Sequence, residues 1–264
     1  MPFARIDDAV LHYAESGKAD GPALVFANSL GTDFRIWDAV VARLPAGSRI
    51  LCYDKRGHGL SDATPAPYAM ERHVADLAGL MDRLGLRDAV IAGISVGGMI
   101  ALGLATVRPD LARGLVLCDT AHRIGTYDMW NARIQAIEKD GIAAIAPGIL
   151  ERWFSKEFRA TRTEDFAGYR NMLIRTTVAG YTGTCAALRD ADLTAGTRRI
   201  TVPTLCLVGD EDGATPPDLV RSMADLIPGA RFEIIAGAGH LPCLEKPDAV
   251  AGLIGGFMKE NGFV

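Results

Sequence analysis

A serine flanked by glycines is the residue of this sequence best placed for covalent chemistry. The segment Gly93-Ile94-Ser95-Val96-Gly97 has the pattern Gly-x-Ser-x-Gly. An apolar run typical of a strand, 89–92, precedes it, and a helix-like run beginning at Gly98 follows. A nucleophile elbow requires this strand–turn–helix context, because the glycines allow the sharp turn that raises the serine hydroxyl above the sheet. The alternative is a tightly packed turn without chemistry, and the context favours the nucleophile.

The serine hydroxyl is a weak nucleophile and needs a base within hydrogen-bond reach. Where a nucleophile elbow is present, the acid and then the histidine follow the serine along the chain, so only His122 and His240 qualify. His240 stands in the glycine-rich loop 236–241 after the last strand-like run, at the edge of a sheet where catalytic groups gather. We therefore expect His240 to be the base and retain His122, near the start of the helical stretch 121–193, as the alternative.

Three aspartates lie at the ends of strand-like runs between Ser95 and His240. Asp212 follows the run 204–208 at a point from which a carboxylate could orient an imidazole. Its rival is Asp119, after the run 114–118, while Asp210 is better explained as part of the turn itself. We predict Asp212 as the acid.

An acyl-transfer site also needs hydrogen-bond donors for the developing oxyanion. The backbone N–H of Val96, immediately after the serine, is one expected donor. The loop 27–32 after an early strand supplies the other, for which Leu30 is the candidate. The alternative for this loop is an ordinary strand-to-helix turn.

Short apolar runs alternating with helical patterns indicate the fold class. Near-continuous apolar runs of this kind suit parallel strands covered on both faces; they are 23–27, 50–53, 89–92, 114–118, 204–208 and 232–235. The opening stretch 4–14 alternates and predicts an antiparallel hairpin at the sheet edge. Helical spacing marks 72–85, 217–227 and 247–261. We predict an α/β fold with a mostly parallel sheet of about eight strands and helices on both faces.

The stretch 121–193 carries only helical patterns, which include 129–138, 142–154 and 165–177. It is too long for an ordinary loop, so we expect an inserted helical cap over one end of the sheet. The core would then comprise residues 1–120 and 194–264.

Composition narrows the possible partners and the compartment. The net charge is −4 without a basic block, which disfavours a nucleic-acid partner. No signal-peptide pattern, membrane-spanning run or metal-ligand motif occurs, so we expect a cytoplasmic protein with no metal and no cofactor. The five widely spaced cysteines fit free thiols. Oligomeric state, whether monomer or small homo-oligomer, stays open.

Several strings resemble the 3-oxoadipate enol-lactonases of the α/β-hydrolase superfamily. They are Phe26-Ala27-Asn28-Ser29-Leu30-Gly31-Thr32, Tyr53-Asp54-Lys55-Arg56-Gly57-His58-Gly59-Leu60-Ser61, Leu117-Cys118-Asp119-Thr120-Ala121 with Arg123-Ile124-Gly125, and Gly239-His240-Leu241-Pro242 with Glu245-Lys246-Pro247. The resemblance covers essentially the whole chain and implies the α/β-hydrolase fold. Two positions depart from the family's pattern: Ile94 stands where Leu is expected, and Asp119 where Asn is expected.

The resemblance also implies a small anionic substrate, an enol-lactone bearing a carboxymethyl group. Because the protein is net acidic, a cation must meet the substrate's carboxylate, and the candidates are Arg133, Arg123 and Arg152. Trp130 and Trp153 could wall the pocket. The alternative for each arginine is a solvated helix face, and for each tryptophan a place in the core.

Other functions remain open on the same residues. A carboxylesterase, a haloperoxidase-like hydrolase or a carbon–carbon bond hydrolase would use the same triad. A receptor that keeps the fold and turns over slowly is an alternative of another class. The Asn28-Ser29 loop and the segment 123–125 favour the lactonase.

Overall fold

The protein is described here by a computed structural model that covers residues 2–264. Eight strands form one sheet in the order β1-β2-β4-β3-β5-β6-β7-β8. The strands from β3 to β8 are parallel to one another, and β2 pairs antiparallel with β1 and β4. Their bounds are β1 Phe3–Ile6, β2 Ala9–Gly17, β3 Ala23–Ala27, β4 Arg49–Tyr53, β5 Ala89–Ile94, β6 Ala112–Cys118, β7 Thr204–Gly209 and β8 Arg231–Ile235.

The parallel strands form where the sequence has continuous apolar runs. Every residue of β3, β5 and β7 is buried, as expected of strands covered on both faces. The opening hairpin pairs Ala4 with Leu11 at the edge of the sheet. The predicted α/β-hydrolase fold with its mostly parallel sheet is confirmed.

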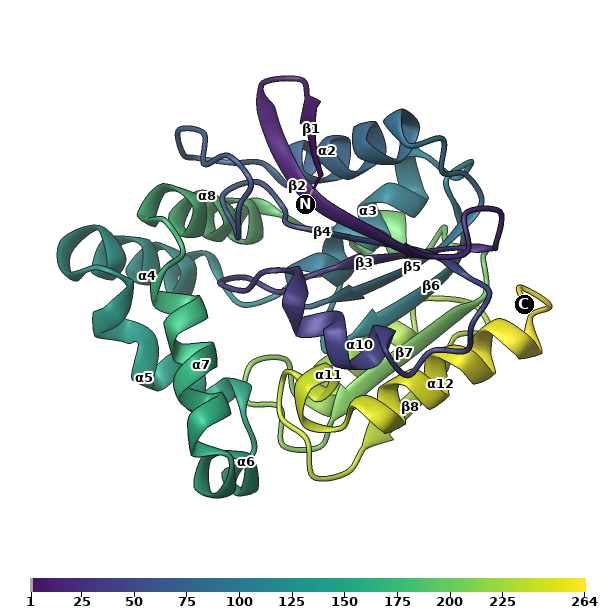
Figure 1. Ribbon diagram of the computed structural model, residues 1–264. Coiled ribbons are helices and arrows are strands. Elements are labelled where there is room, and N and C mark those ends of the chain that lie inside the picture. The colour runs from purple at the N-terminus through teal and green to yellow at the C-terminus, as the bar shows by residue number, and fades with distance from the viewer. Residues whose placement is uncertain (1) are drawn as a thin grey trace.

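Helices cover both faces of this sheet (Figure 1). On one face α2 (Met70–Arg83) packs on α3 (Val96–Val107), and the Val74 side chain lies against Gly103. On the other face α12 (Pro247–Glu260) contacts α1 (Asp38–Val41). The remaining helices of this part are η1 Phe34–Trp37, α9 Thr194–Thr197, α10 Pro217–Ala224 and α11 Pro242–Glu245. With α3 starting directly after β5, the sheet and one helix fix the position of Ser95 between them.

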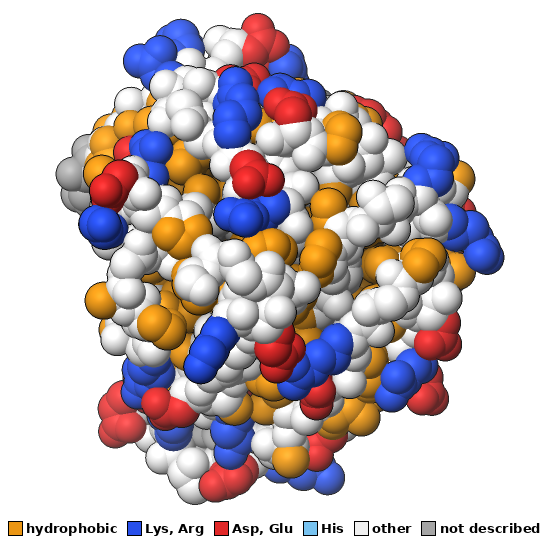
Figure 2. Space-filling view, turned by 90° about the vertical axis from the view of Figure 1, so that its right-hand side faces the viewer, with side chains coloured by type: hydrophobic (Ala, Val, Ile, Leu, Met, Phe, Trp, Pro, Cys, Tyr) orange, Lys and Arg blue, Asp and Glu red, His pale blue; other side chains and the backbone are white. Residues whose placement is uncertain are grey.

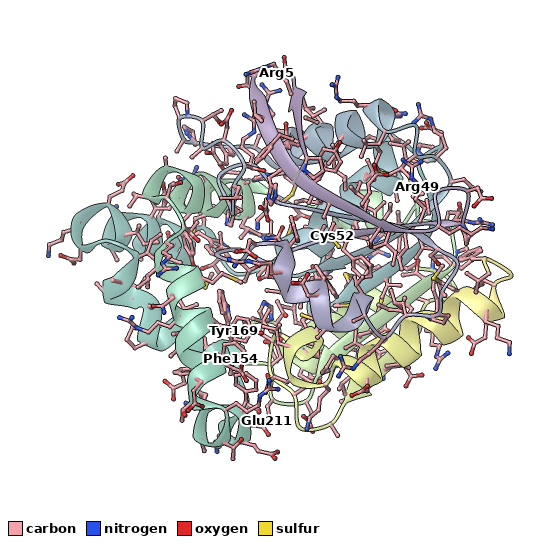
Figure 3. The ribbon with its side chains drawn as sticks, viewed as in Figure 1. Arg5, Arg49, Cys52, Phe154, Tyr169 and Glu211 are labelled. Carbon is pink, nitrogen blue, oxygen red and sulfur yellow. The ribbon has the colours of Figure 1, made fainter. Side chains whose placement is uncertain are left out.

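Five helices between β6 and β7 project from one end of the sheet, in teal and green at the left of Figure 1. They are α4 Tyr127–Asp140, α5 Ile142–Trp153, α6 Lys156–Thr161, α7 Thr163–Ile174 and α8 Val178–Asp190. Within this group α4 packs on α8, and α5 packs on α7. Phe154 stacks on Phe158 and on Tyr169, with ring centroids 4.6 and 5.6 Å apart; Phe154 and Tyr169 are labelled in Figure 3. This arrangement supports the predicted cap over residues 121–193, whose boundaries stay a prediction.

Charges of both signs are interspersed on the surface of the core shown in Figure 2. Neither sign dominates this face, in keeping with the net charge of −4. Among residues 2–264 no helix combines the length and apolarity needed to cross a membrane.

Candidate active site

Ser95 occupies the tip of a strained turn between β5 and α3. Its backbone has φ 57° and ψ −124°, a conformation that costs a residue with a side chain of the order of 1–3 kcal/mol. A Cβ on Gly93 would collide with the backbone of Gly97, and a Cβ on Gly97 with the backbone of Ala27. The Ser95 N–H donates to the Cys118 carbonyl at 3.0 Å. The glycines of the pentapeptide are therefore steric requirements of the turn.

The loop 28–32 after β3 lies near Ser95 and is held by hydrogen bonds between its own residues. The Asn28 side-chain amide donates to the Thr32 carbonyl, and the Thr32 hydroxyl donates to the Ser29 carbonyl at 2.9 Å. The Leu30 N–H has no hydrogen-bond acceptor within residues 2–264, and the Val96 N–H, at the first position of α3, has none either. Both predicted oxyanion donors are thus available.

His240 and Asp212 are joined by a buried hydrogen bond. Nδ1 of the imidazole lies 2.9 Å from Oδ2 of Asp212. The other carboxylate oxygen, Oδ1, accepts from the N–H groups of Ala214 and Thr215 at 2.7 and 3.0 Å, and the Thr215 hydroxyl donates to Oδ2 at 2.7 Å. Burial pushes the pKa of Asp212 upward, but the imidazole and the Thr215 hydrogen bonds outweigh it and lower the pKa below its ordinary value. An ionised Asp212 can therefore hold the imidazole in a fixed orientation.

Asp119, the rival acid, lies beside this pair but is engaged differently. Its Oδ1 accepts from the Gly209 N–H at 2.9 Å, and its buried Oδ2 has no partner within residues 2–264. One oxygen of each carboxylate and one nitrogen of His240 lie within 4.8 Å of one another. Burial, and next the neighbouring Asp212 carboxylate, raise the pKa of Asp119 well above its ordinary value. Of the two carboxylates, only that of Asp212 is hydrogen-bonded to the imidazole, whose Nδ1 also lies 3.3 Å from the Thr215 hydroxyl.

Asp210 serves the turn, as the sequence indicated. Its Oδ1 accepts from the Gly237 N–H at 2.7 Å, which ties the end of β7 to the loop that carries His240. The remaining histidine candidate, His122, is half-buried, and its carbonyl accepts from the Leu193 N–H at the base of the cap.

A cavity of about 180 Å³ contains both Ser95 and His240. Ser29, Leu30 and Thr215 line it from the core, and helices α4, α5 and α8 close it. The lining from these helices includes Trp130, Arg133, Arg152, Trp153 and Tyr181. The volume suits a molecule smaller than a drug, because pockets that bind drug-sized ligands have volumes of about 300–1,000 Å³.

Two arginines in this lining lack acidic partners. Arg133 lies over the Trp130 ring, with its guanidinium carbon 4.7 Å from the centroid. Neither Arg133 nor Arg152 forms an ion pair within residues 2–264. Burial, and next the neighbouring Arg133, lower the pKa of Arg152. Positive charge therefore accumulates in the cavity without a protein counter-ion.

Arg123 is not brought into this cavity. Its side chain is exposed and its Nη1 lies 3.8 Å from Oδ2 of Asp192. Trp130 and Trp153 line the cavity although both are nearly fully buried. Each tryptophan therefore packs in the core and also forms part of the cavity wall. Ser29 lies in the loop that the sequence marked, although no role in the site was assigned to it. The sequence reasoning missed Thr215 and Tyr181, which no local motif marks, because they reach the site from a loop and a helix distant in sequence from Ser95.

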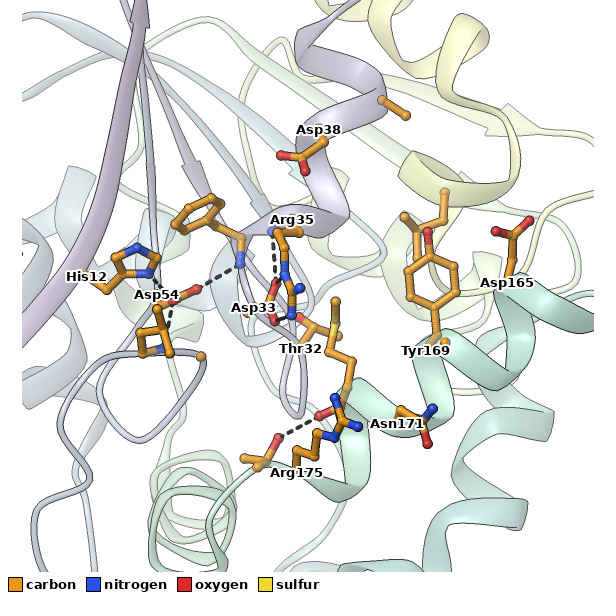
Figure 4. Close-up of a pocket in the computed structure, with 18 of the residues that line it drawn as sticks. His12, Thr32, Asp33, Arg35, Asp38, Asp54, Asp165, Tyr169, Asn171 and Arg175 are labelled. Carbon is orange, nitrogen blue, oxygen red and sulfur yellow. Dashed lines mark hydrogen bonds and ion pairs between the residues drawn. The ribbon is translucent and has the colours of Figure 1, made fainter. Parts of the chain in front are cut away.

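A larger hollow, of about 1040 Å³, is lined by the segment 32–39 after β3 and by residues of α7 (Figure 4). Asp33, Arg35 and Asp38 face Tyr169 of α7 across it. Two ion pairs lie in its lining: Nη2 of Arg35 is 2.6 Å from Oδ2 of Asp33, and Nδ1 of His12 is 2.7 Å from Oδ2 of Asp54. The hollow contains neither Ser95 nor His240, so we place the active site in the smaller cavity.

The sequence matches the Alpha/beta hydrolase family over residues 24–253. The chain belongs to this family. It is 32% identical to 3-oxoadipate enol-lactonase 2 of Acinetobacter baylyi over 252 residues, 96% of this chain and 94% of that protein. To 3-oxoadipate enol-lactonase 1 of the same organism it is 34% identical, over 92% of this chain and 91% of that protein.

A solved structure of an alpha/beta hydrolase agrees with this. The crystal structure of the enol-lactonase from Burkholderia xenovorans LB400 superposes with a TM-score of 0.95 at 35% identity, covering 98% of this chain and all of that one. The resemblance to the 3-oxoadipate enol-lactonases that the sequence motifs indicated is confirmed.

Proposed function

We propose that the protein is a serine hydrolase that opens an enol-lactone of the 3-oxoadipate type by way of an acyl-enzyme. The observation that carries the proposal is the buried Asp212–His240 hydrogen bond, which adjoins Ser95 in one cavity with two unpaired arginines. The likeness to proteins named 3-oxoadipate enol-lactonase supports the substrate class.

In the first step Ser95 attacks the lactone carbonyl while His240 takes its proton. Asp212 keeps Nδ1 protonated and stabilises the imidazolium that forms. The developing oxyanion accepts hydrogen bonds from the Leu30 and Val96 N–H groups, which are free to donate. Cleavage of the ring C–O bond expels an enolate, which takes the proton from the His240 imidazolium and tautomerises to a ketone while its chain stays attached to Ser95.

In the second step a water molecule hydrolyses the acyl-enzyme. His240 removes a proton from the water as it attacks the acyl carbon, and then returns a proton to the Ser95 oxygen as the ester bond breaks. The product is an open-chain dicarboxylate. No residue role in either step requires a metal or an organic cofactor.

The substrate's free carboxylate is assigned to Arg133 and Arg152. Both guanidinium groups line the cavity without an acidic partner, and charge-assisted hydrogen bonds between guanidinium and carboxylate are strong and directional. Arg133 is held over the indole of Trp130, which limits its freedom before substrate arrives. Tyr181 and Trp153 wall the remaining space.

The five cysteines are all free and buried, which supports a reducing compartment such as the cytoplasm. They play no part in the proposed chemistry, since burial raises the pKa of the Cys206 and Cys185 thiols to about 12.

The nucleophile is tested by replacing Ser95 with Ala. The variant should fold normally and lose about 10³-fold or more in kcat, because only binding and oxyanion stabilisation remain. A fluorophosphonate probe should add one mass adduct to the wild type, at the peptide containing Ser95, and none to the variant. Retention of a tenth of the wild-type kcat would overturn the assignment.

A further inference from the structure

Lys55 has no role in the mechanism above, although its side chain is among the most deeply buried of the charged residues. It follows β4 in the segment 53–61, and only 1% of it is exposed. Its Nζ donates a hydrogen bond to the backbone carbonyl of Ser29. Within residues 2–264 this is its sole hydrogen-bond partner, and it forms no ion pair with a carboxylate.

A lysine buried in this way is expensive, because its ammonium group loses hydration that a single carbonyl does not replace. Burial accordingly lowers the pKa of Lys55 well below its ordinary value, against the attraction of Asp54. The hydrogen bond to the Ser29 carbonyl does not depend on whether Lys55 is protonated, since a neutral amine still carries N–H donors. The side chain therefore holds the Ser29 carbonyl in either protonation state.

The Ser29 carbonyl belongs to the same peptide unit as the Leu30 N–H. That unit is planar and trans, so its C=O and N–H bonds point in opposite directions. Lys55, the Thr32 hydroxyl and, at 3.4 Å, the Thr32 N–H donate to the carbonyl end, whereas the Leu30 N–H has no acceptor within residues 2–264. Ser29 and Leu30 both line the cavity that contains Ser95.

We propose that Lys55 is a positioning residue that aims the oxyanion donor Leu30 by fixing the carbonyl on the far side of its peptide unit. This inference rests on the proposed function, because it needs an oxyanion at Ser95. Oxyanion donors are effective when they are oriented before charge develops, so that no reorganisation accompanies the reaction. Without Lys55 only Thr32 holds this carbonyl, so the peptide gains freedom to rotate and the Leu30 N–H is less precisely aimed, while ground-state contacts in the cavity remain.

The test replaces Lys55 by Met, which fills similar space without a donor. The turnover of an ester substrate should fall by about 10- to 100-fold in kcat, less than the 10²–10³-fold lost when a donor is removed outright. KM should change by no more than about two-fold, because substrate binding does not use the donor fully. A trifluoromethyl ketone, which forms a tetrahedral adduct with Ser95, should bind more weakly by the same factor as kcat/KM falls, while the dicarboxylate adipate should bind as before.

Three further variants separate positioning from general destabilisation. Val74→Ala in α2 leaves a gap against Gly103, neither of which lines the cavity, and should lower Tm with kcat unchanged. Thr32→Val removes the hydroxyl donor to the same carbonyl, leaves the Thr32 N–H in place, and should produce a smaller loss of the same selective kind. Lys55→Gln, whose amide nitrogen lies one bond closer to the backbone, is the alternative should the methionine variant fail to fold.

The outcomes distinguish this inference from the proposed function. The positioning role would be overturned if the Lys55 variants lost affinity equally for the trifluoromethyl ketone and for adipate. It would also be overturned if their kcat per active site equalled that of the wild type. If neither Lys55 variant folds, the same comparison of ketone and adipate binding is made on Thr32→Val, and equal losses of affinity there would overturn the positioning role. An active Ser95→Ala variant would instead overturn the proposed function.

Discussion

Asp212 and Asp119 lie close together in the buried end of the site, yet their surroundings shift their pKa values in opposite directions, down for Asp212 and up for Asp119. Asp212 receives three hydrogen bonds in addition to the imidazole contact, whereas one oxygen of Asp119 has no donor within residues 2–264. Two carboxylates this close in a dry environment do not both ionise easily. We infer that Asp212 carries the negative charge and Asp119 the proton.

Exchanging each acid for its amide separates the two roles. Asp212→Asn should lower kcat by about 10³–10⁴-fold, because an amide stabilises the wrong imidazole tautomer. Asp119→Asn should retain at least about a third of the wild-type kcat, since an amide replaces a neutral carboxyl closely in shape and hydrogen bonding. Steady-state kinetics at pH 7 provide the measurement, and the opposite ranking would transfer the acid's role to Asp119.

At the scale of elements, helices α4 and α5 supply the cavity's positive charge through Arg133 and Arg152. Arg133→Ala should lower kcat/KM about 10- to 100-fold on an anionic lactone and leave a neutral ester almost unaffected, because a hydrogen bond to a charged group contributes about 1.5–3 kcal/mol. Arg123→Ala is the matched control, as its side chain is exposed beside Asp192 outside the cavity. Equal losses on charged and neutral substrates would assign Arg133 a role in the fold of α4 only.

Helix α11 links the His240 loop to the cap through Glu245. Its Oε1 accepts from the Gly239 N–H at 2.8 Å, and its Oε2 accepts from the Ser155 hydroxyl at the start of α6. Glu245→Ala should cost about 1–3 kcal/mol of unfolding free energy, because the buried donors of Gly239 and Ser155 lose their acceptor. It should also lower kcat, since the loop next to His240 is released. Chemical denaturation together with kcat checks both; an unchanged kcat would show that the loop is held by other contacts.

At the scale of the whole molecule, the architecture could be predicted from sequence because its signals are local. Continuous apolar runs marked the parallel strands, and the strand–turn–helix context marked Ser95. The short helices α6, α9 and α11 were missed, since elements of four to six residues show too little periodicity. The contacts of Lys55 and Thr215 were also beyond reach, because they depend on which distant loops meet at the sheet edge. The catalytic roles and the domain boundaries stay proposals.

The stability of the molecule should depend on pH through Asp119. Its pKa is raised in the folded state, so the folded protein holds a proton that the unfolded chain releases near the ordinary value of 3.8. Stability from this group is therefore present at low pH and is lost as pH rises from 3.8 toward the folded pKa. Asp119→Asn should match the wild type in Tm near pH 4 and exceed it at pH 7–8, by about 2–4 °C for each kcal/mol regained. Parallel Tm curves at all pH values would show that Asp119 does not hold this proton.

Hydrolysis of the enol-lactone itself is the most direct test of the account. Purified protein should open 3-oxoadipate enol-lactone with a kcat/KM of at least about 10⁴ M⁻¹s⁻¹, within the ordinary range for an enzyme and its own substrate. The value for p-nitrophenyl acetate should be lower by about 100-fold or more, because the acetate ester offers no carboxylate to Arg133 and Arg152. A preference for the neutral ester, or no turnover of the lactone by protein that reacts with the fluorophosphonate probe, would contradict the lactonase and leave a general esterase.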